Sequence, residues 1–264
     1  MELFKSYSKE NAVKVIAFAI NFEQEIALIN ITELIDKLKE NQKIKDNFNE
    51  EKIQTVVSMT FNQDGIPNQK NSIGGIVFNK KEEDKILWTL IVNKDSVIVT
   101  CRDYSRWDTI STQALDYIDI VLNEMNSIKI SQLTLEYLDE FEILEVKSDW
   151  KKNLFKDDCE YITPNIYQLD DFWHISQGYF IKLSDIDEKI LDTIDINYFA
   201  DETDNLKHKV NMRMQHKLLY NASISYNKEN ISNCFNKIHI HSKDIFFEIV
   251  DSKITNKFNI GELS

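Results

Sequence analysis

The chain has 264 residues, of which 42% are hydrophobic and 11% aromatic, so it predicts a globular protein with a sizeable core rather than a disordered chain. Its net charge of −13 at pH 7 produces a field that repels nucleic acid and anionic membranes and favours basic proteins as partners. Only 5 glycines and 2 prolines are present, and neither the dinucleotide-binding nor the P-loop glycine pattern occurs, which argues against both kinds of phosphate chemistry.

The first half of the chain begins with a strand and a helix. Residues 12–22 are apolar at both parities, a pattern typical of a central strand that is covered on both faces. Apolar residues at helical spacing then predict a helix over about 27–47. Three or four strands of an antiparallel meander follow, with turn signals between them, at 51–62, 72–80, 84–93 and 95–102.

A second helix and a strand complete this half. Ser105 and Asp108 form a start that resembles a capping box, and the apolar residues from Trp107 to Met125 follow the spacing of an amphipathic helix. The strand 130–146 comes next, and its odd-numbered face is apolar apart from one carboxylate. The members of that face are Leu133, Leu135, Tyr137, Asp139, Phe141 and Ile143.

The second half follows the same logic of a meander with a packed helix. Residues 147–170 lose periodicity and contain Pro164, which predicts a long connection or a lobe boundary. Strands are expected near 172–183, 190–200 and 206–219, and a long helix from about 228 to 253 with Asn227 as its N-cap. We therefore predict an α+β fold with mostly antiparallel sheets, packed helices, two related-looking lobes and a long C-terminal helix. The lobes comprise residues 1–147 and 148–264, or together form one continuous unit.

One block resembles a sporadically distributed bacterial family of uncharacterised proteins. That family has an Asp-Tyr pair, a Trp shortly after it, a helix, and a strand of the pattern Leu-Arg-Tyr-Ile-Asn. The matching positions here are Asp103, Tyr104 and Trp107, then Leu135, Glu136, Tyr137, Leu138 and Asp139. Glu136 stands where the family has Arg and Asp139 where it has Asn, so an anion-binding role of that Arg does not carry over.

The end of the chain extends the resemblance. The family tends to close with a long helix that contains a His and a run of Phe and Ile, and Ile238-His239 with residues 244–249 is similar. The resemblance implies an architecture and no catalytic residues. The family's scattered distribution implies an accessory, mobile-element or defence gene.

Asp139 is the first candidate binding residue, because an inward carboxylate on an apolar face must be paired or hydrogen bonded. One interpretation is structural, with Asp139 accepting hydrogen bonds from backbone N–H groups or from a Tyr or Trp. The other is a ligand-binding or catalytic role. Arg102, close to the end of the neighbouring predicted strand, is its expected ion partner in either interpretation.

The second candidate is a basic strand in an acidic chain. No Asp or Glu occurs between Asn205 and Lys228, and four cations share one strand parity and hence one outer face: Lys207, Lys209, Arg213 and Lys217. These side chains pair across the hairpin with the acidic strand that carries Asp192 and Asp195, or they form a docking surface for an anionic partner such as nucleic acid.

No catalytic or metal-binding set has convincing spacing, and we expect neither a metal nor another cofactor. His239 and His241 lie two apart in a helical segment and so point about 200° apart, which prevents a shared metal. His208 and His216 lie about 26 Å apart along one strand. A nuclease-like Glu-x-Lys at Glu145 would need an upstream Asp on a neighbouring strand, and the sequence does not identify which Asp that would be.

The cysteines and the apolar segments bear on the compartment. Cys101, Cys159 and Cys234 are far apart and without zinc spacing, as is common for free thiols in a reduced cytoplasm. No segment reaches about 18 apolar residues, and no secretion signal is apparent at the start. We expect a cytoplasmic protein that does not insert into a membrane.

Three classes of function fit these observations. We prefer a non-enzymatic interaction subunit of a bacterial accessory system, of the immunity, antitoxin or phage-defence type, that binds a protein partner. The alternatives are a nucleic-acid-directed protein or nuclease that uses the basic strand, which the net charge disfavours, and a small-ligand-binding module with a pocket between sheet and helix. The sequence leaves the partner and the oligomeric state open.

Overall fold

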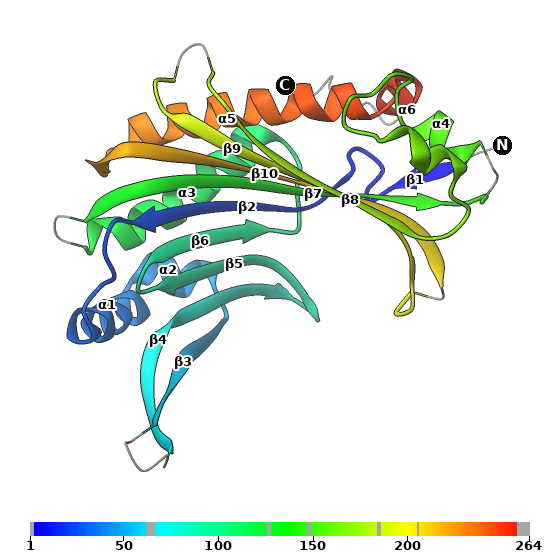
Figure 1. Ribbon diagram of the computed structural model, residues 1–264. Coiled ribbons are helices and arrows are strands. Elements are labelled where there is room, and N and C mark those ends of the chain that lie inside the picture. The colour runs from blue at the N-terminus through cyan, green and yellow to red at the C-terminus, as the bar shows by residue number, and fades with distance from the viewer. Residues whose placement is uncertain are drawn as a thin grey trace.

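The computed structural model of the protein describes residues 3–61, 67–125, 128–146, 149–183, 186–204 and 206–257. Its centre is one antiparallel sheet with the strand order β3-β4-β5-β6-β2-β7-β10-β9-β8, and β1 pairs with the end of β7 (Figure 1). The strands are β1 (Phe4–Ser6), β2 (Val13–Phe22), β3 (Glu50–Phe61), β4 (Pro67–Glu82), β5 (Lys85–Asn93), β6 (Ser96–Cys101), β7 (Lys129–Ile143), β8 (Trp173–Ile181), β9 (Lys189–Asp201) and β10 (Lys207–Ser225).

The helices are α1 (Leu28–Glu40), α2 (Gln42–Asn47), α3 (Trp107–Asn123), α4 (Trp150–Leu154), the 3₁₀ helix η1 (Pro164–Gln168), α5 (Lys228–Ile249) and α6 (Ser252–Lys257). The α+β class and the antiparallel pairing are therefore as predicted. Strands from both halves of the chain share the one sheet, because β7 pairs with β2 on one side and with β10 on the other. The predicted boundary at residues 147 and 148 lies outside the described residues.

The helices cover one face of the sheet, which we call the helix face. Phe18 on β2 contacts Trp107 of α3 and Phe235 of α5, with ring centroids 5.6 and 5.3 Å apart. Trp88 on β5 contacts Tyr117 of α3. Figure 1 shows α5 running along this side of the sheet next to β9 and β10.

The opposite face, which we call the open face, carries no helix in the described part of the chain. On β2 the buried residues are Ile16, Phe18, Ile20 and Phe22, all on the helix face. The alternate residues Val15, Ala17 and Ala19 are only half-buried. The prediction that β2 is covered on both faces is therefore wrong, although its sequence is as apolar as that of a doubly covered strand.

Two helix starts differ from the prediction. The helix expected over 27–47 is interrupted at Asn41, which has an extended backbone conformation. The side chain of Asn41 caps α2 by accepting hydrogen bonds from the N–H groups of Lys43 and Ile44. At α3 the N-cap is Arg106 rather than Ser105, and it makes no side-chain capping bond. A side-chain cap thus stabilises the start of α2, whereas the start of α3 is stabilised by packing and has no such cap.

The later elements agree more closely with the pattern. Asn227 caps α5 by accepting from the N–H of Asn230, as predicted. The aperiodic stretch 147–170 contains α4 and η1, which are too short to produce a periodic signal. Within the described residues, no helix is long and apolar enough to cross a bilayer.

Candidate functional site

The open face has an apolar centre. Strand register places one residue of each central strand in a single row across the sheet: Thr134 on β7, Ala19 on β2, Ile98 on β6, Ile91 on β5 and Val77 on β4. The next row is smaller and more polar, with Ala17 between Glu136 and Thr100. Side chains in one row are direct cross-strand neighbours, so the apolar groups form a continuous strip rather than scattered contacts.

The predicted basic strand is β10, and its odd-numbered residues do lie on the open face. Their partners differ from the prediction, however. Asp192 lies directly opposite His216 in the β9–β10 pair, on the helix face, and both residues are fully buried. Asp195 does lie opposite Arg213, but the guanidinium Nη2 of Arg213 pairs with Oε2 of Glu136 on β7 at 2.7 Å.

The other cations of β10 also lie near carboxylates. Lys209 Nζ lies 2.8 Å from Asp201, 3.0 Å from Asp204 and 3.6 Å from Glu140, and only 6% of Lys209 is exposed. Lys207 lies 3.3 Å from Asp204 and 3.5 Å from Glu142. Lys217 makes no ion pair with the described residues. Most of the positive charge of this strand is therefore neutralised within the chain.

These pairs predict unequal effects of single substitutions. Lys209→Gln should lower the melting temperature at pH 7, because Asp201, Asp204 and Glu140 would lose a shared cation. The hydrogen bonds from Lys209 and Thr203 hold the pKa of Asp201 below its ordinary value, so this contribution is present above about pH 4 and is lost as the pH falls further.

Lys217→Gln is the matched control, and thermal unfolding of both variants at pH 7 and pH 3 is the measurement. A melting temperature that falls equally for the two variants would contradict the assignment of the Lys209 network.

Asp139 lies on the helix face of β7, as the alternation predicted, and is 3% exposed. Its carboxylate has no hydrogen-bond or ion-pair partner among the described residues. Burial raises the pKa of Asp139 to about 7. The prediction of Arg102 as its ion partner is wrong, because β2 lies between β6 and β7 in the sheet and the Arg102 side chain is exposed.

Asp139 borders a cavity of about 100 Å³ between the sheet and α5. The floor is formed by Tyr137 and Met214, which are 5% and 2% exposed, beside Asp139 itself. Residues of α5 form one wall, among them Ser242, Lys243, Phe246 and Phe247. Exposed Glu10 and Ser105 lie at the rim, so the cavity has access to solvent.

His239 of α5 connects this cavity to α3. Its ring stacks on Trp107 with centroids 4.1 Å apart, and its Nδ1 lies 2.8 Å from the hydroxyl oxygen of Tyr137. Burial, with Lys243 nearby, lowers the pKa of His239 to about 4, so the ring stays neutral at physiological pH. The Tyr137 hydroxyl is thus engaged by His239 and does not serve Asp139.

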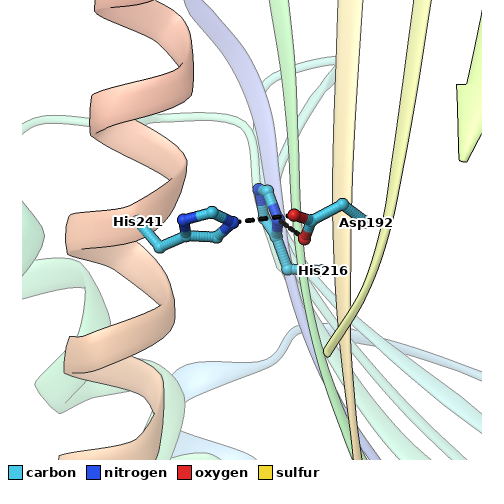
Figure 2. Close-up of side chains that lie close together, drawn as sticks. All are labelled: Asp192, His216 and His241. Carbon is cyan, nitrogen blue, oxygen red and sulfur yellow. Dashed lines mark hydrogen bonds and ion pairs between the residues drawn. The ribbon is translucent and has the colours of Figure 1, made fainter. Parts of the chain in front are cut away.

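A second polar cluster lies under α5 and comes from three elements (Figure 2). Asp192 of β9 accepts from His216 of β10 at 2.7 Å and from His241 of α5 at 2.7 Å, through different carboxylate oxygens. Asp192 and His216 are fully buried. Burial raises the pKa of Asp192, but the bonds from the two histidines outweigh it and hold the pKa below its ordinary value.

This cluster was not predicted from the sequence, although the pairing of His216 with Asp192 could have been. A hairpin that pairs Lys207 with Asp201 places His216 opposite Asp192 by simple counting. His241 could not be assigned in the same way, because its position depends on where α5 lies on the sheet. His239 and His241 do point into different sites, as the helical spacing predicted.

The donor types of this cluster, two imidazoles and a carboxylate, are those of zinc and iron sites, and one ligand atom from each lies within 4.8 Å of the others. The distances are those of hydrogen bonds. Ligand atoms that share a tetrahedral zinc lie about 3.3–3.5 Å apart, since each lies about 2.0–2.2 Å from the ion. The 2.7 Å separations would have to lengthen before one ion could be shared.

We therefore keep the prediction that EDTA does not shift the thermal unfolding of the purified protein and that elemental analysis finds no stoichiometric transition metal. The measurement is a melting curve with and without chelator, and Asp192→Asn provides a variant in which the cluster is impaired. Close to one equivalent of zinc or manganese in the native protein, lost in Asp192→Asn, would contradict the prediction.

Comparison of the chain with protein-family models and with curated proteins finds no match.

Proposed function

We propose that the protein is a non-enzymatic interaction subunit of a bacterial accessory system, of the immunity, antitoxin or phage-defence type. In this proposal it binds a protein partner in the cytoplasm, and the binding surface is the open face of its sheet. The observation that carries this proposal is the uncovered apolar strip through Ala19, Ile98 and Ile91. β2 has the sequence of a strand with two covered faces, yet the described residues cover only one of them. A partner supplies the missing layer.

The dimensions and charge of this face are suited to a protein. Adjacent strands lie about 4.8 Å apart, so the strip across β2, β6, β5 and β4 extends over about 14 Å. Around it lie paired charges such as Arg213 with Glu136, which provide a polar rim. The net charge of −13 favours a partner that is basic at its own rim.

The alternative of a nucleic-acid-directed protein has weaker support. It relied on the cations of β10, and three of the four lie within 4 Å of carboxylates of the same chain. A surface that binds nucleic acid needs cations that are free to pair with phosphates and so displace the counter-ions condensed on the nucleic acid. We expect the protein to pass through immobilised DNA and RNA even at low salt, and retention that falls as salt rises would favour this alternative instead.

The proposed function is tested by capture of a partner with matched variants. The wild-type protein, the double variant Ile91→Lys and Ile98→Lys, and the control Ile240→Lys are each used as bait, with captured proteins identified by mass spectrometry. Ile240 is 60% exposed on α5 and lies away from the open face, so its substitution introduces a charge of the same sign elsewhere. We expect one partner at near-stoichiometric amount with the wild type and the control, and its loss with the open-face variant.

Thermal unfolding of all three baits tests for a folding defect. We expect similar melting temperatures, because the substituted side chains are already partly exposed to water. Loss of the partner with Ile240→Lys and its retention by the open-face variant would contradict the proposal. So would light scattering that shows a dimer of the chain itself, dissociated only by the open-face substitutions. In that case a second copy covers the strip.

A further inference from the structure

The carboxylate of Asp139 lacks a compensating group. A buried carboxylate is normally hydrogen bonded or paired with a cation, because desolvation of an isolated charge is costly. The two tyrosines that line the cavity beside Asp139 do not provide this compensation. Tyr137 is engaged by His239, and Tyr104, although it lines the cavity, makes no hydrogen bond to Asp139. Among the described residues no partner is available, so a ligand or a proton is left to compensate this carboxylate.

The cavity beside Asp139 has walls suited to a cation. Four aromatic residues line it, namely Tyr104, Tyr137, Phe246 and Phe247. The faces of such rings attract cations, most strongly where water is excluded. The ammonium of Lys243 lies 5.9 Å from the centroid of the Phe247 ring, so one ring of the lining already interacts with an alkylammonium of the chain.

The size of the cavity and its rim limit the ligand. Its volume of about 100 Å³ is several times the room of about 10–15 Å³ that one water needs, and is suited to a small organic group. Exposed Glu10 adds a second negative charge and Lys243 one positive charge, so with Asp139 ionised the lining carries a net charge of −1. Apolar Val13 and Met214 suit an alkyl portion of the ligand.

We propose that this cavity is a binding site for a small organic cation, an alkylammonium or methylated ammonium group, with Asp139 as its counter-ion and the aromatic residues as its walls. The site lies on the helix face, under α5, and is separate from the open face that binds the protein partner. Cation binding removes the cost of the unpaired carboxylate, so the ligand stabilises the folded chain.

The titratable and charged groups around Asp139 set the pH dependence of binding. These groups are Glu10 in the loop before β2, Tyr104 in the loop before α3, Tyr137 on β7, and His239 and Lys243 on α5. From β10 only Met214 lines the cavity, and it does not titrate. Both tyrosine pKa values are raised, chiefly by burial, and the pKa of His239 is lowered to about 4, so none of these three changes charge between pH 6 and 8. Asp139, with its pKa near 7, does.

The test uses the full chain and two cationic probes, n-butylammonium and tetramethylammonium chloride, measured by titration calorimetry and thermal shift. The neutral probe 1-butanol matches butylammonium in shape, and sodium chloride matches it in ionic strength. We expect saturable binding of the cations at pH 8, none of 1-butanol at equal concentration, and affinity about tenfold weaker at pH 6, where about nine tenths of Asp139 is protonated.

Two variants and one control connect binding to the named residues. Asp139→Asn should abolish cation binding while the fold survives, since it removes a buried charge and little volume. Phe247→Leu should weaken tetramethylammonium binding about two- to thirtyfold through loss of the ring face. The control Asp187→Asn changes a fully exposed carboxylate and should bind as the wild type does.

Three results would overturn the proposal. Cations that stabilise the protein no more than sodium chloride does would show that the cavity does not select them. Equal binding of 1-butanol would show a merely apolar pocket. Unchanged affinity in Asp139→Asn would show that the carboxylate is not the counter-ion. The capture experiment on the open face is independent of all three.

Discussion

Asp139→Asn should stabilise the protein strongly at alkaline pH and hardly at all at acidic pH. The pKa of Asp139 is about 7 in the folded chain and about 3.9 in an unfolded one, so the folded state binds more protons between these values. The contribution of Asp139 to the stability of the wild type therefore falls as the pH rises from about 4 to about 7 and is constant above. A difference of about 3 pKa units corresponds to about 4 kcal/mol.

The measurement is the free energy of unfolding by urea at pH 4 and pH 8 for both proteins. We expect the difference between variant and wild type to grow by about 4 kcal/mol from pH 4 to pH 8, because the asparagine stays neutral throughout. Any packing effect of the substitution is common to both pH values and cancels. A difference that stays constant between them would mean that Asp139 ionises as freely as an exposed carboxylate.

Trp107→Ala should produce the largest loss of stability at neutral pH, about 3–5 kcal/mol. Trp107 is 8% exposed and stacks between Phe18 of β2 and His239 of α5. Its indole N–H donates to Oδ1 of Asn236 at 2.7 Å. The substitution leaves a cavity where α3, α5 and the sheet meet, and it removes the partner of an amide as well.

Trp107→Phe separates the two contributions, since it keeps a ring in the stack and loses only the hydrogen bond. We expect it to cost less than half as much as Trp107→Ala in urea unfolding at pH 7. An alanine variant with wild-type stability that no longer captured the partner would instead make Trp107 a binding residue.

The strands and α5 were predictable because their signals are local. Alternation along β7 and β10 and the 3.6-residue spacing of α5 depend only on which side chains are near in sequence. The break at Asn41 was not predicted, since a single amide side chain that caps α2 competes with an otherwise continuous apolar spacing.

The candidate site could be predicted only in part, because its residues come from elements that are far apart in the sequence. Asp139 was identified from the sequence because it interrupts an apolar face. Its partner was assigned wrongly, because the sequence does not reveal that β2 lies between β6 and β7. His216 and His241 belong to one cluster only because α5 crosses β9 and β10, and no spacing along the chain encodes that crossing.

The two histidines of α5 have a mechanical consequence. His239 contacts Trp107 and Tyr137 on one flank of the helix, and His241 contacts Asp192 on the other. Rolling the helix about its own axis in either direction would break one of these contacts. The helix is therefore held at a fixed rotation, and Phe246 and Phe247, about two turns after His239, keep their orientation toward the cavity beside Asp139.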